Sequence, residues 1–135
     1  MQNNIQPKYV SFEIAEWLSE KGFDVPCRYI YNIVGGIEDW IEYADDFRYF
    51  NNSKWKSSPY YSAPEQWQVM EWLRINHGIW IVVNIGIPHG QGIMYYSNVI
   101  KFGLHHKNKY RSAFFNSPQE AYNAAFDYIK DNNLV

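Results

Sequence analysis

Cysteine, signal sequences and long apolar runs are what this sequence has least of. Cys27 is the only cysteine, so no disulfide can form within the chain, and a reducing compartment is expected. No stretch approaches the roughly 18 uninterrupted apolar residues of a membrane span. The first residues, MQNNIQPKYVSFEIAEW, lack the basic and then apolar order of a signal peptide. The sequence therefore predicts a cytoplasmic protein with no membrane partner.

Excess charge of one sign is also lacking. The net charge is −2, which argues against a protein that binds a phosphate backbone through many Lys and Arg contacts. Charged residues make up 19% and hydrophobic residues 47% of the chain, a balance that favours a packed core over disorder. At 135 residues, the chain is expected to form a single domain spanning 1–135.

Aromatic residues, in contrast, are abundant. The chain holds 6 Trp, 12 Tyr and 8 Phe, which is 19% of its residues and more than a core of this size needs. We therefore expect some rings to lie at the surface, where aromatic side chains make contacts with partners.

Three helices are predicted from serines that precede apolar-periodic runs. Ser62 and Ser117 are each followed three residues later by glutamate, Glu65 and Glu120, which is the capping-box pattern. Ser11 begins the third case without the full box. The helices are expected at about 12–21, 64–76 and 118–131.

Strands are predicted between the helices. Segments 27–34 and 37–43 flank the Gly35-Gly36 pair and indicate a hairpin, and the β-branched run 79–87 is typical of a central, two-sided strand. Further strands are expected at 93–104 and 109–115, and the polar segment 51–59 reads as a surface connection.

This order predicts an α+β fold, with about three helices packed on a mostly antiparallel sheet. Segments 16–23 and 71–79 share Glu-Trp-Leu before a glycine, and strand-like sequence follows each of them. This similarity suggests a weak internal α-β duplication.

Catalytic machinery is not indicated by any motif. The four histidines and neighbouring acids show no metal-ligand spacing, and the glycines around 86–92 lack the order of a phosphate-binding loop. Cys27 has no activating neighbourhood and is interpreted as a small buried residue. We therefore assign no catalytic residue, no metal site and no cofactor, and an enzyme is the third of the three functional classes considered.

The first hypothesis is a binding protein that contacts a host or phage protein, or a second copy of itself as a homodimer. Acidic residues gather in 38–46 and basic residues in 101–111, and tryptophans amid polar neighbours are favoured interface anchors. The candidate contact residues are Trp40, Trp55, Trp67 and Trp72, with only one of the last two expected to be exposed.

The alternative is single-stranded nucleic-acid or nucleotide binding through the region 95–111. Aromatic and basic residues alternate there, and such proteins stack bases on rings beside cationic side chains. The candidate residues are Tyr96, Lys101, Lys107, Lys109, Tyr110 and Arg111.

Three segments carry a resemblance to other proteins: YVSFEIAEWLSEKGFDVPCRYIY, YYSAPEQWQVMEWLRINHGIWIVV and FNSPQEAYNAAFDYI. Together they resemble a group of small uncharacterised proteins encoded by bacterial genomes and their prophages. The resemblance implies a mobile-element origin, an intracellular setting and an accessory protein that binds a host or phage macromolecule. It brings no catalytic residues with it.

Overall fold

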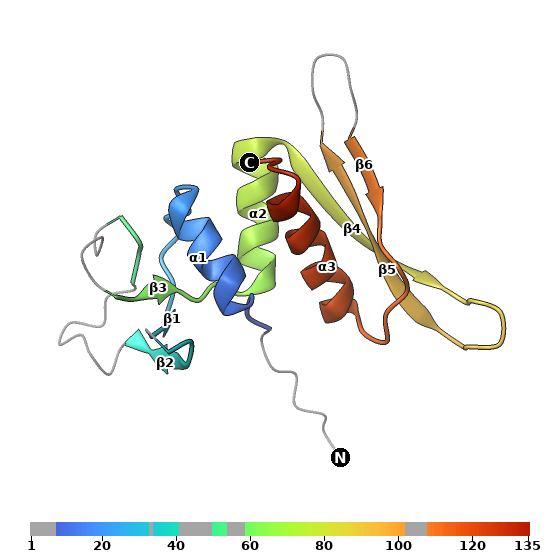
Figure 1. The fold of residues 1–135 in the computed structure, drawn as a ribbon, viewed down its shortest axis with the longest axis horizontal. Coiled ribbons are helices and arrows are strands. Elements are labelled where there is room, and N and C mark those ends of the chain that lie inside the picture. Colours follow the sequence, from blue (N-terminus) through green and yellow to red (C-terminus); the bar gives the residue numbers. More distant parts are fainter. Residues whose placement is uncertain (1–7, 33, 41–49, 54–58, 102–107) are drawn as a thin grey trace. The chain divides into compact units, whose positions relative to one another are not determined.

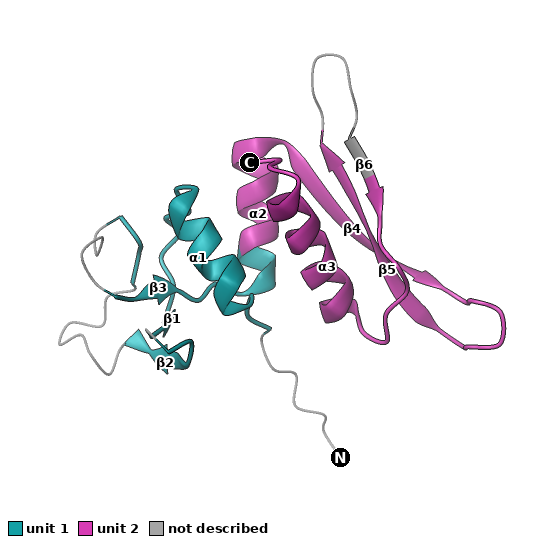
Figure 2. Ribbon diagram, viewed as in Figure 1, with its two compact units in different colours: residues 1–68 teal, residues 69–135 magenta. Residues whose placement is uncertain are grey.

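The chain forms two compact units, 1–68 and 69–135, and the boundary between them falls inside a helix (Figure 2). The computed structural model describes residues 8–32, 34–40, 50–53, 59–101 and 108–135, with the side chains of 108 and 109 excepted. These residues form three helices and two three-stranded antiparallel sheets, which confirms the predicted α+β class (Figure 1).

The elements follow one another in the order α1 (Phe12–Glu20), β1 (Tyr29–Tyr31), β2 (Ile37–Asp39), β3 (Tyr61–Ser62), α2 (Gln66–His77), β4 (Ile79–Gly86), β5 (Met94–Lys101), β6 (Asn108–Arg111) and α3 (Pro118–Asp131).

Helix α1 of the first unit begins and ends at the residues that the sequence indicated. The Ser11 hydroxyl accepts the Ile14 N–H at 3.3 Å, as an N-cap does. The chain leaves the helix through Gly22, whose φ is +88°, and the Phe23 N–H then donates to the Leu18 carbonyl at 2.9 Å. Phe23 and Leu18 are both fully buried, so the end of the helix is also part of the core.

The sheet of the first unit has the order β2-β1-β3. The predicted glycine turn joins β1 to β2, and Gly35 there has a φ of +85°. The Asn32 side chain accepts the N–H groups of Val34 and Gly36, at 3.1 and 2.9 Å, and so holds the turn closed.

The capping box expected at Ser62 is wrong. Ser62 ends β3 and is buried, with its hydroxyl accepting the Asn52 amide at 2.9 Å and its N–H donating to the Asn52 carbonyl oxygen at 3.0 Å. Helix α2 begins at Gln66, two residues later than predicted. The Gln68 side chain accepts the Glu65 N–H at 2.9 Å, so glutamine rather than glutamate performs the reciprocal half of the cap.

The sheet of the second unit has the order β4-β5-β6. Strands β4 and β5 pair over their whole length, from Ile79↔Lys101 to Gly86↔Met94, and β6 pairs only with the last residues of β5. Within the residues that the structure describes, β4 is therefore an edge strand. The expectation of a central strand buried on both faces at 79–87 is wrong, because Ile79 and Ile81 are buried but the alternate residues Trp80 and Val82 are exposed.

Helix α3 has the capping box that the sequence predicted. The Ser117 hydroxyl accepts the Glu120 N–H at 3.3 Å, and the Glu120 carboxylate accepts the Ser117 N–H at 3.2 Å. Its apolar stripe packs against β5 and β4. The buried residues of the stripe are Ala121, Ala125, Phe126 and Ile129.

Both units follow a helix with a three-stranded sheet, but the sheets differ in strand order. The first strand after the helix is central in the first unit and lies at the edge in the second. The shared Glu-Trp-Leu step therefore does not extend to a shared sheet topology. No helix among the described residues has the length and apolarity that crossing a membrane requires.

Replacement of the α3 cap tests its contribution to stability. The variant Ser117→Ala leaves a first-turn N–H without its acceptor, so we expect the free energy of unfolding, measured in urea, to fall by about 1 kcal/mol. The control variant Ser117→Asp restores an acceptor of suitable charge and is expected to unfold near the wild-type midpoint. Equal losses in the two variants would contradict the capping role.

Candidate functional site

The two faces of the β4-β5-β6 sheet have different surroundings. Directly opposed residues of antiparallel strands point to the same face. One face carries the buried Ile79, Ile81 and Val99 and is covered by α3, whose Tyr128 stacks on Tyr110. We call the opposite face the open face; its described strand side chains are those of Trp80, Val82, Asn84, Met94, Tyr96, Asn98, Ile100 and Arg111.

Large apolar side chains lie exposed on this hairpin. On the open face Trp80 is 45% exposed and Val82 is 42% exposed. Three isoleucines around the turn between β4 and β5, which we call the hairpin tip, are more exposed still. Ile85, Ile87 and Ile93 have exposed fractions of 65%, 75% and 62%.

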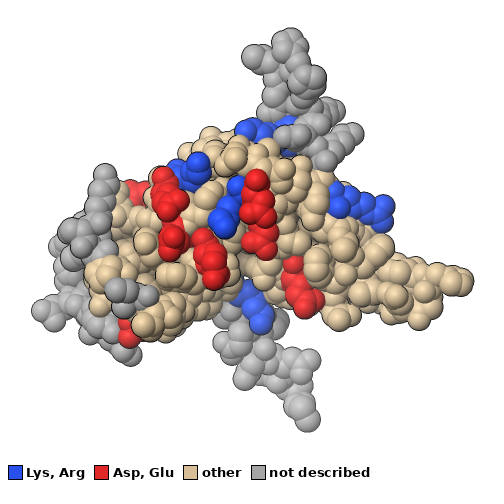
Figure 3. All heavy atoms as spheres, in the orientation of Figure 1, with Lys and Arg blue, Asp and Glu red and all other residues tan. Residues whose placement is uncertain are grey.

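Charge is missing from the same segment. The sequence has no Asp, Glu, Lys or Arg between Arg74 and Lys101, a stretch that spans the end of α2, all of β4 and nearly all of β5. On the side of the molecule drawn in Figure 3, the surface of the hairpin tip is accordingly tan, without the blue or red of charged residues. Apolar surfaces of this kind are typical of contact sites.

A shallow depression of about 290 Å³ lies in the middle of the sheet. Its lining residues are Val82, Asn84, Asn98, Val99, Ile100 and Tyr110. The Asn84 amide donates to the Asn98 side-chain oxygen at 2.8 Å, and the Asn98 amide donates to the Tyr110 carbonyl at 3.4 Å. These amides bond to each other across the strands, so the floor of the depression offers mainly apolar contact.

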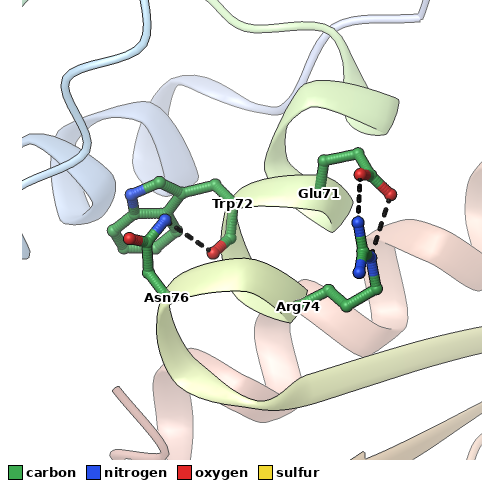
Figure 4. Close-up of polar contacts among 4 residues, drawn as sticks. All are labelled: Glu71, Trp72, Arg74 and Asn76. Carbon is green, nitrogen blue, oxygen red and sulfur yellow. Dashed lines mark hydrogen bonds and ion pairs between the residues drawn. The ribbon is translucent and has the colours of Figure 1, made fainter.

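The exposed side of α2 borders Trp80. The Arg74 guanidinium lies 5.4 Å from the centroid of the Trp80 ring and forms an ion pair with Glu71 at 2.7 Å. This pairing lowers the pKa of Glu71 and raises that of Arg74, mainly through their hydrogen bonds. Figure 4 shows the Trp72 indole on the other side of the helix, where the Asn76 amide donates to the Trp72 carbonyl at 3.2 Å.

The four tryptophans proposed as contact residues differ in exposure. Trp67 is 60% exposed, and Trp72 is buried with its ring 4.6 Å from that of His77. The expectation that only one of this pair is exposed is confirmed. Trp40 is also buried, so its expected role as an exposed contact is wrong: its neighbours in the sequence are polar, but its ring packs in the core of the first unit. Trp55 lies outside the described residues.

Two of the proposed nucleic-acid contacts are engaged on the α3 side of the sheet. The rings of Tyr110 and Tyr128 are stacked, with centroids 4.0 Å apart and planes at 9°. The Lys101 ammonium donates to the Leu134 carbonyl near the end of the chain. Tyr110 therefore has one ring face covered by Tyr128. The Lys101 ammonium already donates a hydrogen bond within the second unit.

The other proposed nucleic-acid contacts lie on the open face or outside the described residues. The Arg111 guanidinium lies 4.5 Å from the centroid of the Tyr96 ring, and the Phe114 ring meets Tyr96 edge-on at 5.4 Å. Tyr96 and Arg111 are thus brought together, but one ring face of Tyr96 is already occupied by the cation. Lys107 and the side chain of Lys109 lie outside the described residues.

Sequence reasoning missed the exposed residues of the hairpin, Trp80, Ile85, Ile87 and Ile93. It treated the segment 79–87 as buried on both faces because that segment is rich in branched residues. The signal that could have found them is the long interval without charge, since such an interval with glycine and proline at its turn cannot be wholly core.

Groups that could perform chemistry do not gather in the described part of the chain. No cluster of three His, Cys, Asp or Glu suited to a metal ion occurs there. Cys27 is buried, its thiol donates to the Val25 carbonyl at 3.3 Å, and burial raises its pKa to about 12. The exposed apolar hairpin is therefore the strongest candidate site.

Comparison with known proteins yields no relative, since no family model, no curated protein and no solved structure matches this chain.

The Cys27 thiol should resist modification in the folded protein. Its pKa of about 12 keeps it protonated at neutral pH, and burial blocks access, so we expect a thiol-specific chromogenic disulfide to label it far more slowly in buffer than in urea. Because the raised pKa applies to the folded state, stability should fall between pH 9 and 12, as the unfolded thiol ionises first. Rapid labelling without denaturant would contradict this burial.

Gly86 should be required where β4 meets Phe114. A methyl group at Gly86 would overlap the Phe114 ring, so Gly86→Ala forces that ring from its contact with Tyr96. We expect the free energy of unfolding to fall by about 1–3 kcal/mol. In a Phe114→Ala background the same change should cost much less, and an unchanged cost there would show that the ring is not the cause.

Proposed function

We propose that this protein is a small interaction module that binds a protein surface through the open face and the hairpin tip of its second unit. The observation that carries the proposal is a set of exposed aliphatic and indole side chains on one uncharged hairpin: Trp80, Val82, Ile85, Ile87 and Ile93.

The chemistry of this surface favours a protein partner. Interface centres are depleted in charge and enriched in large apolar and aromatic residues, and a charged rim surrounds them. Here Arg74 with Glu71 stands beside Trp80 at one end, and Arg111 stands beside Tyr96 across the sheet. The contact residues proposed from sequence are thereby revised, with Trp80 and the hairpin isoleucines taking the place of Trp40 and Trp72.

Single-stranded nucleic acid is the second candidate, and the pairing of Arg111 with Tyr96 on the open face supports it. Such binding would draw on cationic contacts and would weaken steeply with added salt. Binding through the hairpin tip would respond little to salt, because its isoleucines carry no charge.

Paired variants test the proposal. The double variant Ile87→Ser/Ile93→Ser removes two side chains at the tip, and the control Ile75→Ser removes an equally exposed isoleucine from α2. Each tagged full-length protein is used to capture partners from a lysate of its source cells, with and without nuclease. A captured protein is then titrated against each variant.

The tip variant should bind the partner at least a hundredfold more weakly, since it loses two isoleucines and each contributes about 1.5–3 kcal/mol when buried. The Ile75→Ser control should bind as the wild type does. Binding that survives in the tip variant, or material that disappears on nuclease treatment, would overturn the proposal and favour the second candidate.

A further inference from the structure

The hydrogen bonds of β5 show which peptide groups of the sheet are used. The N–H and carbonyl of Tyr95 both bond to Phe115, at 2.9 and 2.7 Å, and the Ser97 carbonyl accepts the Ser112 N–H at 2.9 Å. Odd-numbered residues of β5 therefore direct their peptide groups away from β4. Even-numbered residues of β5 direct theirs toward it, because successive peptide groups alternate along a strand.

The same alternation identifies the groups at the outer edge of β4. Even-numbered residues of β5 lie opposite even-numbered residues of β4 in the register. It follows that Ile79, Ile81, Val83 and Ile85 direct their N–H and carbonyl groups to the outer edge, of which Ile79 is fully buried and the other three form the accessible part. No described strand pairs with that edge.

The outer edge of β4 lacks the features that prevent edge strands from pairing with strands of other molecules. Proteins protect such strands with lysine, proline, bulges or short length. Strand β4 is eight residues long, contains neither a charged residue nor proline, and pairs with β5 without interruption. An unpaired strand of this kind can form backbone hydrogen bonds with a strand of another molecule.

We propose that a second copy of this chain occupies the edge, with β4 pairing antiparallel to β4 of the partner about a twofold axis at Val83, so that the two sheets become one of six strands. The inference rests on the proposed function, because it names the partner of the same hairpin.

Self-complementarity favours a second copy over a different chain. Two identical strands can pair without placing like charges opposite each other, since β4 carries none. A twofold axis at Val83 sets Ile81 opposite Ile85 of the partner, and the pairing stops short of Ile79, which is fully buried. The exposed Ile85 of each copy thus gains an aliphatic neighbour, and the closed symmetry pairs the accessible part of this edge in both copies.

Sedimentation equilibrium of the full-length protein tests the proposal across micromolar to millimolar concentrations. The wild type should have twice the 16.1 kDa mass of one chain. The variant Val83→Pro removes an N–H that points to the edge and not to β5, so it should sediment as a monomer while keeping the wild-type circular dichroism. The matched control Val83→Ala loses side-chain contacts but keeps the N–H and should stay dimeric.

Amide hydrogen exchange of the wild type gives a measurement that does not depend on a variant folding. In the dimer the amides of Ile81, Val83 and Ile85 should be protected, and dilution should remove that protection. Fast exchange at all concentrations, or protection that dilution does not change, would overturn the proposal, as would a Val83→Pro variant that remains dimeric.

Failure of this inference can be told apart from failure of the proposed function. A monomeric wild type whose captured partner is lost with Ile87→Ser/Ile93→Ser overturns the pairing and leaves the interaction surface in place. A monomeric wild type whose binding ignores the tip overturns both.

Discussion

The structure of the second unit depends on a single helix covering one face of its sheet. Helix α3 has 14 residues and is therefore about 21 Å long, whereas the eight paired residues of β4 extend about 27 Å before the turn begins. A helix of that length cannot cover the whole hairpin. Ile85 is on the covered face by register, and it is nevertheless exposed because the hairpin extends past the helix. The open face follows from coverage by one helix only, and the exposed hairpin tip follows from this difference in length.

Local signals in the sequence predicted the elements that depend on neighbouring residues. The Ser11 and Ser117 caps and the Gly35 turn were predictable, because each forms hydrogen bonds or dihedral angles within a few residues. Ser62 has the same pattern, but its hydroxyl accepts the buried Asn52 amide instead of a first-turn N–H. Sequence spacing cannot reveal such a distant partner.

Exposure of individual residues was harder to predict, because it depends on which surface packs against another. Trp40 has acidic neighbours in the sequence, yet it packs in the core of the first unit, with its ring centroid 5.1 Å from that of Phe50. Trp80 lies in an aliphatic run that reads as core, yet it is partly exposed. In both cases the polarity of adjacent residues pointed the wrong way. For Trp80 the reason is that alternate strand residues face opposite surroundings.

Helix α2 belongs to both compact units, and this affects how the protein unfolds. The cap that starts the helix, at Glu65 and Gln68, lies in the first unit, while the buried Val69 and Leu73 lie in the second. Neither portion is long enough to be a stable helix alone, since isolated helices shorter than about 12–15 residues are marginal in water. Loss of structure in either unit therefore withdraws support from the other. Because the two units share this helix, we expect the chain to unfold cooperatively, although its sheets are separate.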